Sequence, residues 1–232
     1  MTVLSDKQIR HRLGTDVFIA PFREEQLQST GYDIRLGPNF YRHNPQCSLK
    51  YFNPNNGKHI TEYWGANNDV KQNYGAEKAM LMETKEQAEL YGAKIGDQII
   101  LIEPGELILG HTIEFIGSKN NVKPNINARS SSARCGVSIC KCSFNGESGF
   151  IGIWALEIEN HSEVTLALNV GECFGQITFH ETGPIDNPYR GSYQDTNDFE
   201  TLQEIWTPKD ILPSLGKKYL TQEFIDASKC EK

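Results

Sequence analysis

The sequence predicts an all-β protein with short flanking helices. From Gln98 to Glu181 it holds seven short segments whose apolar residues alternate with polar ones or run together, as in half-buried or buried strands. Turn signals such as Pro104-Gly105 and Val170-Gly171 lie between them. This spacing favours a sandwich or a barrel over βαβ units.

Two elements are expected before this region. Ser5 and Gln8 fit a capping box, in which each side chain accepts a hydrogen bond from a backbone N–H at the start of a helix. A short helix is therefore expected from Asp6 to about Leu13. Residues 31–43 then alternate like a strand that is interrupted at Gly37-Pro38.

A polar insertion, rich in Asn, Gly, Lys and Glu, occupies residues 46–97. One helix is expected within it, from about Lys85 to Tyr91, because Thr84 and Gln87 form a second capping box. The strands that follow read QIILIE, ELILGHTIEFIG, NINARS, CGVSICKCS, GIWALEIEN, EVTLALN and CFGQITFH.

The end of the chain has a different composition. After Gly183 it is rich in Pro, Gly, Tyr and Asp, which suits a flap, and a polar tail with a helix from Thr221 to about Ser228 follows. No repeat or linker marks a second domain. We expect one domain over residues 1–195 and an extension of flap and tail over residues 196–232.

Composition limits the class of partner and the compartment. The formal net charge of -7 over 232 residues argues against nucleic acid and acidic membranes as partners. The first residues carry charges where a signal peptide is apolar, and no apolar run approaches the ~20 residues that cross a bilayer. The 6 cysteines lack disulfide-framework spacing, so reduced thiols and a cytoplasmic location are expected.

Cys140 and Cys142 stand two residues apart in an expected strand, where they would share a face. Structural zinc normally takes four ligands, and no second pair is present nearby. Packing is therefore favoured over a metal site, and no metal held by the protein's own side chains is expected.

The stretch ARSSSARCG places three serines between Arg129 and Arg134. The planar guanidinium group and the serine hydroxyl and backbone donors are suited to phosphate oxygens. The stretch therefore reads as a phosphate cradle, while a polar turn whose serines bond their own backbone is the alternative.

Two carboxylates follow. Glu147 lies in a glycine-rich turn, from which it can point into a cleft. Glu157 lies in an apolar strand, where alternation puts it on one face with Ile153, Ala155 and Glu159, opposite Trp154, Leu156 and Ile158. That face could instead be the solvated side of a half-exposed strand.

Six stretches, GYDIRLG, PGELILGHTIEFI, ARSSSARCG, ESGFIGIWALEIEN, GECFGQITFHETGP and PYRGSYQ, occur in this order. Together they resemble the dCTP deaminase branch of the dUTPase-like superfamily, over residues 31–44 and 98–194. The resemblance implies a distorted jelly roll, or β-clip, assembled as a homotrimer with sites shared between neighbouring chains. It also implies Mg2+ bound with the nucleotide triphosphate.

The resemblance implies a role for individual residues. Glu157 matches the general acid/base glutamate, and Glu147 matches the acid that contacts the sugar or, in phosphate-cleaving relatives, activates the attacking water. Ser130 and Arg134 help to organise the reaction centre, and Ser130 could hold the reactive water. The other matched nucleotide-binding positions are Arg129, Ser131, Ser132, Ala155, Leu156, Gln176, Tyr189 and Tyr193.

The chain departs from the family pattern at five positions. Asn145 replaces an arginine, Ser143 an alanine, Ser192 a lysine and Thr196 a glutamine, while Glu147 replaces an aspartate. These changes bear on the substrate and on how the flap contacts the phosphates, and the fold does not depend on them.

The expected function is therefore hydrolysis of dCTP to dUTP and ammonia. One glutamate can take a proton from water and deliver it to the base if an apolar site moves its pKa toward neutral. A bifunctional enzyme that forms dUMP, a dUTPase and a catalytically silent nucleotide-binding regulator are the alternatives. A zinc deaminase is not expected, because His161 and Glu163 form H-x-E but no P-C-x-x-C follows.

Overall fold

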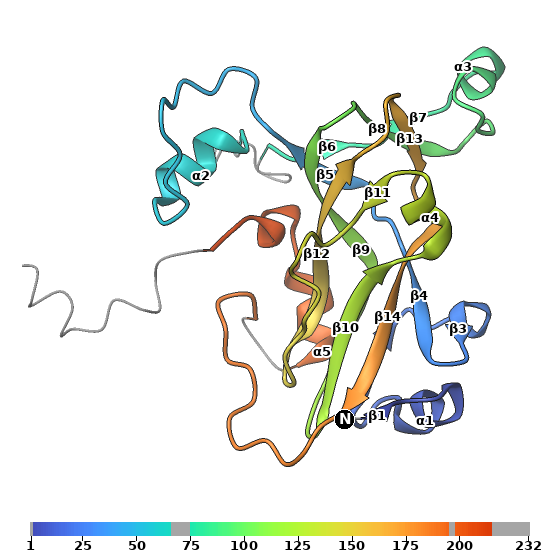
Figure 1. Ribbon diagram of the computed structural model, residues 1–232, viewed down its shortest axis with the longest axis vertical. Helices are drawn as coiled ribbons and strands as arrows, with labels where there is room; N and C mark the ends of the chain where they lie inside the picture. The colour runs from blue at the N-terminus through green and yellow to red at the C-terminus, as the bar shows by residue number, and fades with distance from the viewer. Residues whose placement is uncertain (1, 66–74, 195–197, 215–232) are drawn as a thin grey trace, which may run out of the picture.

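The computed structural model describes residues 2–65, 75–194 and 198–214, whose strands form three antiparallel sheets (Figure 1). The first contains β1 (Thr2–Val3), β3 (Leu27–Gln28), β4 (Gly31–Arg35), β10 (Val122–Ala128) and β14 (Cys173–Glu181). The second contains β2 (Val17–Ala20), β5 (Asn39–Arg42), β6 (Glu77–Lys78), β9 (Leu107–Ser118), β11 (Val137–Ser138) and β12 (Ile151–Asn160). The third contains β7 (Met80–Leu81), β8 (Gln98–Ile102) and β13 (Leu166–Asn169).

The helices of the described chain are short. They are α1 (Asp6–Arg12), α2 (Gly57–Tyr63), α3 (Lys85–Leu90), α4 (Ser130–Arg134) and α5 (Phe199–Ile205), with the 3-10 helices η1 (Glu24–Gln26) and η2 (Pro208–Ile211). Both expected capping boxes are present, at the first turns of α1 and α3. No helix of the described residues is long and apolar enough to cross a membrane.

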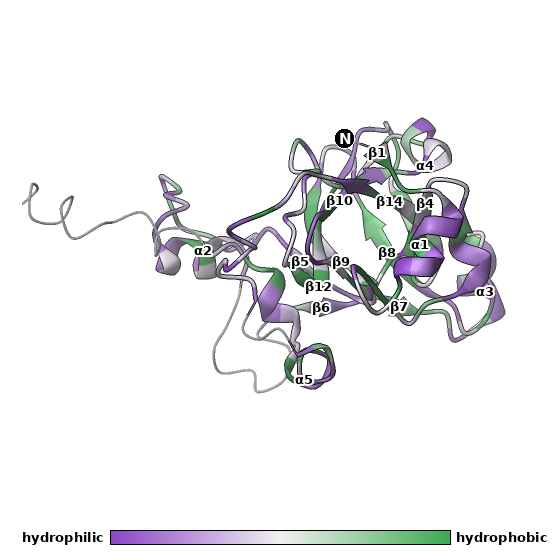
Figure 2. Cartoon of the chain, turned by 90° about the horizontal axis from the view of Figure 1, so that it is seen from below, coloured by the Kyte–Doolittle hydropathy of each residue, from purple (hydrophilic) through white to green (hydrophobic). Residues whose placement is uncertain are grey.

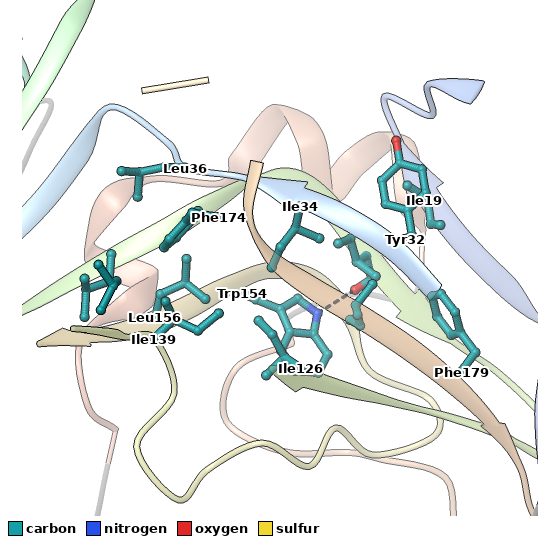
Figure 3. Packing of buried hydrophobic residues seen from close by; sticks show 14 of the residues in the cluster. Ile19, Tyr32, Ile34, Leu36, Ile126, Ile139, Trp154, Leu156, Phe174 and Phe179 are labelled. Carbon is teal, nitrogen blue, oxygen red and sulfur yellow. Dashed lines mark hydrogen bonds between the residues drawn. The ribbon is translucent and has the colours of Figure 1, made fainter. Parts of the chain in front are cut away.

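The main core lies between the sheets, because each central strand turns its apolar residues inward. Ile34, Ile126, Leu156 and Ile177 are at most 1% exposed and belong to one cluster, and Figure 3 shows part of it around Trp154. The indole Nε1 of Trp154 donates a hydrogen bond of 3.0 Å to the carbonyl of Ile116, so even its polar atom is satisfied in the core. In Figure 2 several strands around the core are coloured hydrophobic along much of their length, whereas α1 and α3 are largely hydrophilic.

Several local expectations need correction. The stretch after Arg129 was expected to be a turn, but it forms the short helix α4. The strand expected over Cys135–Ser143 is limited to the two residues of β11. Lys141 has a φ of 44°, in the left-handed region, so Cys140 and Cys142 do not lie on one strand face. Cys140 is half-buried against the core and Cys142 is exposed.

The insertion and the tail hold structure that sequence reasoning missed. Residues 46–97 contain α2, β6 and β7 as well as the expected α3. After the flap, α5 and η2 pack back on the second sheet, where η2 contacts both β9 and β12. The helix expected from Thr221 to Ser228 lies outside the described residues.

Candidate active site

The outer face of the β9–β12 pair is the floor of a cavity. In its antiparallel register Glu157 is opposite Leu109, and Ala155 is opposite His111. A bulge between Ile153 and Ala155 shifts the register, but the alternation of buried and accessible side chains along β12 is as predicted. Glu157 is therefore on the outward face, as expected, and it is half-buried there instead of fully solvated.

The cavity has a volume of about 910 Å³ and contains both carboxylates of interest. Five of the predicted site residues line it, namely Glu147, Ala155, Glu157, Tyr189 and Tyr193. Four positions that depart from the family pattern line it as well, namely Ser143, Asn145, Glu147 and Ser192. Four of the five departures thus gather at the cavity that contains both carboxylates. Thr196 lies outside the described residues.

The environment of Glu157 suits a proton carrier. Burial raises the pKa of its carboxyl group, and a hydrogen bond from its own backbone acts in the opposite direction. The backbone of Cys140 forms an isolated β-bridge with the backbone of Glu157. The pKa of the Cys140 thiol is raised, mainly by burial and then by the charge of Glu157. Glu159, two residues further on, pairs instead with Lys141 and His161.

The flap forms one wall of this cavity. The backbone N–H of Tyr189 donates to the carbonyl of Ser148 at 2.7 Å. The Tyr189 ring packs edge-on against the ring of Phe150, with centroids 5.6 Å apart. The backbone N–H of Ile151 donates to Gln194 Oε1 at 2.9 Å. These contacts hold the flap beside the start of β12.

The stretch that sequence reasoning predicts as a phosphate cradle lies outside this cavity. Arg129 is the extended residue before α4, while Ser130, Ser131 and Arg134 on the helix are exposed and Ser132 is partly exposed. No residue of this helix lines the cavity of Glu157, and neither Arg129 nor Gln176 does. The side chain of Leu156 is fully buried in the core, so only its backbone could contact a ligand.

Asp33, which sequence reasoning missed, organises that cradle. Its side chain is 6% exposed, and its Oδ2 lies 3.3 Å from Arg129 Nε. Gln176, its cross-strand partner, donates from Nε2 to its Oδ1 at 3.1 Å. Arg129 Nη1 also donates to the carbonyl of Cys173 at 3.0 Å. Asp33 thus fixes two predicted nucleotide-binding side chains.

A second ion pair starts from the same strand, β4, and both of its side chains are buried. Glu114 is 0% exposed, and its Oε1 lies 2.6 Å from Arg35 Nε. The backbone N–H of Arg35 also donates to its Oε2 at 3.0 Å. The stretch GYDIRLG could have indicated both ion pairs, because it places the charged residues Asp33 and Arg35 in one strand. All five residues of that strand, β4, are buried, and a buried charge needs a partner.

Comparison with known proteins gives consistent matches. The family described as dCTP deaminase-like matches residues 3–182. A "dCTP deaminase, dUMP-forming" of Hathewaya histolytica is 31% identical over 193 residues, which are 83% of this chain and 91% of that protein. The protein of the same description from Leptospira biflexa serovar Patoc (strain Patoc 1 / Ames) is 29% identical over 193 residues, 83% of this chain and 90% of that one.

Among solved structures, the 2'-deoxycytidine 5'-triphosphate deaminase from Agrobacterium tumefaciens is similar, with a TM-score of 0.50 and 18% sequence identity. The match covers 76% of this chain and 47% of that one. This likeness concerns the fold, and it confirms the predicted all-β, dUTPase-like fold class.

Proposed function

Because the chain belongs to the dCTP deaminase-like family, we propose that it is a hydrolase that converts dCTP to dUMP. In the first step, water replaces the amino group at C4 of the cytosine, giving dUTP and ammonia. In the second, water cleaves between the α and β phosphates, giving dUMP and pyrophosphate. Sequence reasoning ranked dUTP as the end product, but the matching proteins are described as dUMP-forming, which supports the bifunctional alternative better.

The observation that carries this proposal is that Glu157 and Glu147 line one cavity. Glu157, half-buried and with a raised pKa, takes the proton of the attacking water and returns protons to N3 and to the leaving amine. Glu147 is exposed at the rim, where it can contact the sugar and activate water for the second step. Each carboxylate thus has a separate step.

The phosphates require a second group of residues. In this proposal Arg129, Ser130 and Arg134 hold the triphosphate, with Ser131, Ser132 and Gln176 as further contacts. None of these lines the cavity of the same chain, so in this proposal a neighbouring copy completes the site, as in the homotrimer that the resemblance implies. Sedimentation should give a trimer, and a monomer that persists at high concentration would contradict this arrangement.

Magnesium belongs to the substrate in this proposal. Among the described residues no group of three or more His, Cys, Asp or Glu side chains is placed to hold a metal ion. The phosphate oxygens would therefore supply ligands for Mg2+, which neutralises their charge during cleavage. The net charge of -7 favours such a small ligand over nucleic acid or an acidic membrane.

A product assay tests the two roles. With dCTP and Mg2+ the wild type should release ammonia, dUMP and pyrophosphate without accumulating dUTP. Glu157→Gln keeps size and hydrogen bonding but cannot accept the proton, so ammonia release should fall by about 100-fold or more while dUTP is still cleaved. Glu147→Gln should still release ammonia but stop at dUTP.

Other outcomes assign other functions. Accumulation of dUTP by the wild type would indicate a simple deaminase. Pyrophosphate from dUTP without ammonia from dCTP would indicate a dUTPase. Tight nucleotide binding without any product would indicate a regulator.

A further inference from the structure

The segment Asp198–Ser214 lies beyond residue 182, where the family match ends, yet it is docked against the candidate site. At its start, the ring of Phe199 packs edge-on against Phe115 of β9, with centroids 6.1 Å apart. Further on, Trp206 packs against the buried His111, with centroids 4.8 Å apart. The segment therefore has aromatic anchors at two points along β9.

A separate hydrophobic cluster holds the end of the segment. Ile211 of η2 is 4% exposed and belongs to one cluster with Leu109 of β9 and with Ile60 and Trp64 from the insertion. The backbone N–H of Ser214 then donates to the hydroxyl of Tyr193 at 2.9 Å. The tail and the insertion, which both lie outside the resemblance, thus pack together on one face.

This segment is one side of the cavity that contains Glu157. The cavity-lining residues it supplies are Leu202, Ile205, Trp206, Lys209, Asp210, Ile211, Leu212, Pro213 and Ser214. The floor opposite is Ile153, Ala155 and Glu157 of β12 with Leu109 of β9. Ile211 packs in the same cluster as Leu109, which is the cross-strand neighbour of Glu157.

We propose that Asp198–Ser214 is a fixed apolar roof that keeps bulk water away from Glu157. Trp206 and Ile211 are then positioning residues, because they act on the reaction only through the environment of that carboxylate. The inference rests on the proposed function in assigning proton transfer to Glu157. It adds that residues outside the family match set how well Glu157 performs it.

The electrostatics agree with an apolar cover. Burial is the largest cause of the raised pKa of Glu157. The titratable and charged groups that face Glu157 or line its cavity are Lys209 and Asp210 of η2, Glu147, Tyr189 and Tyr193 at the rim, and Cys140 across the bridge. Lys209 and Asp210 have opposite charges, so the roof contributes mainly by excluding water.

Opening the roof should lower the pKa of Glu157. The variants are Trp206→Ala and Ile211→Ala, and the control is Ile60→Ala, which removes a side chain from the same cluster without opening the cavity. NMR of protein with labelled Glu carboxyl carbons, with Glu157→Gln to identify the signal, reads the titration directly. We expect a decrease of roughly 0.5–1 unit in the two roof variants and a smaller change in the control.

The pH profile gives a second readout. In the roof variants the acid limb of kcat/KM for ammonia release should move to lower pH by the same amount, with kcat near neutral pH reduced. If Ile211→Ala does not fold, Ile205→Ala, at a cavity-lining residue that is 46% exposed, should give a shift in the same direction. An unchanged titration of Glu157 in folded roof variants, or an equal shift in Ile60→Ala, would overturn the proposal.

The two proposals fail separately. If the wild type releases no ammonia from dCTP, the proposed function is wrong, whereas the NMR titration still decides whether the roof shields Glu157. If ammonia is released but the titration is insensitive to the roof, the function stands and the roof inference is wrong.

Discussion

Replacing Asp33 with asparagine tests whether a buried carboxylate organises the phosphate cradle. The variant keeps the shape of the side chain and an amide oxygen that can still accept from Gln176, but it replaces the charged oxygen that faces Arg129 Nε with an NH2 group. Arg129 should then sample other rotamers, and a triphosphate would have to order it on binding. We expect weaker triphosphate binding with the fold intact.

The magnitude follows from the geometry. The distance of 3.3 Å between Arg129 Nε and Asp33 Oδ2 exceeds the usual length of a charge-assisted hydrogen bond, and the Arg129 side chain is 39% exposed. Both facts place the loss below the range for buried hydrogen bonds to charged groups and at the upper end for exposed ion pairs, ~1 kcal/mol. A loss of this size corresponds to an increase in Kd of about fivefold.

The assay is calorimetric titration with a deoxynucleotide triphosphate whose α,β bridge is an imido group, so that it cannot be cleaved. Asp33→Asn, Arg129→Ala and the double variant form a cycle. If Asp33 acts through Arg129, Asp33→Asn should change the affinity little in the Arg129→Ala background. Equal losses in both backgrounds, or an unchanged affinity in Asp33→Asn, would refute the reasoning.

Two further predictions concern stability. Arg35→Leu leaves the fully buried Glu114 unpaired and should lower the free energy of unfolding by about 3–5 kcal/mol in urea titrations. The control is Arg10→Leu, which breaks the exposed ion pair of Arg10 with Glu24 and should change the free energy of unfolding little; a similar loss in both variants would contradict the role of burial. Burial lowers the pKa of His111 to about 4, so the fold favours its neutral form. Neutral His111 therefore contributes to the free energy of unfolding in full above its ordinary pKa of 6.5. This contribution, roughly 3 kcal/mol in total, is lost as the pH falls toward 4. His111→Gln should show less loss of stability over this range in melts at stepped pH, and an identical pH dependence would show that other groups cause it.

Part of the site could be predicted from local pattern. Alternation along β12 placed Glu157 on the face opposite Trp154 and Leu156, and the structure has that arrangement. Sequence reasoning could not decide whether Glu157 is solvated, because the cavity in which it lies half-buried is lined in part by Trp206 and Ile211, about 50 residues further along the chain.

What the sequence determined by itself is local. Capping boxes, turn glycines and the two-residue period of the strands depend on neighbouring residues, so α1, α3 and the principal strands could be located in advance. The pairing of Asp33 with Arg129 and Gln176 depends on β4, β10 and β14 meeting in one sheet, across as many as 143 residues of sequence. Docking of η2 over β9 likewise depends on apolar side chains that hydrophobic burial brings together without regard to their order in the chain. Tertiary structure alone therefore decided which carboxylate is shielded and which arginine is held in place.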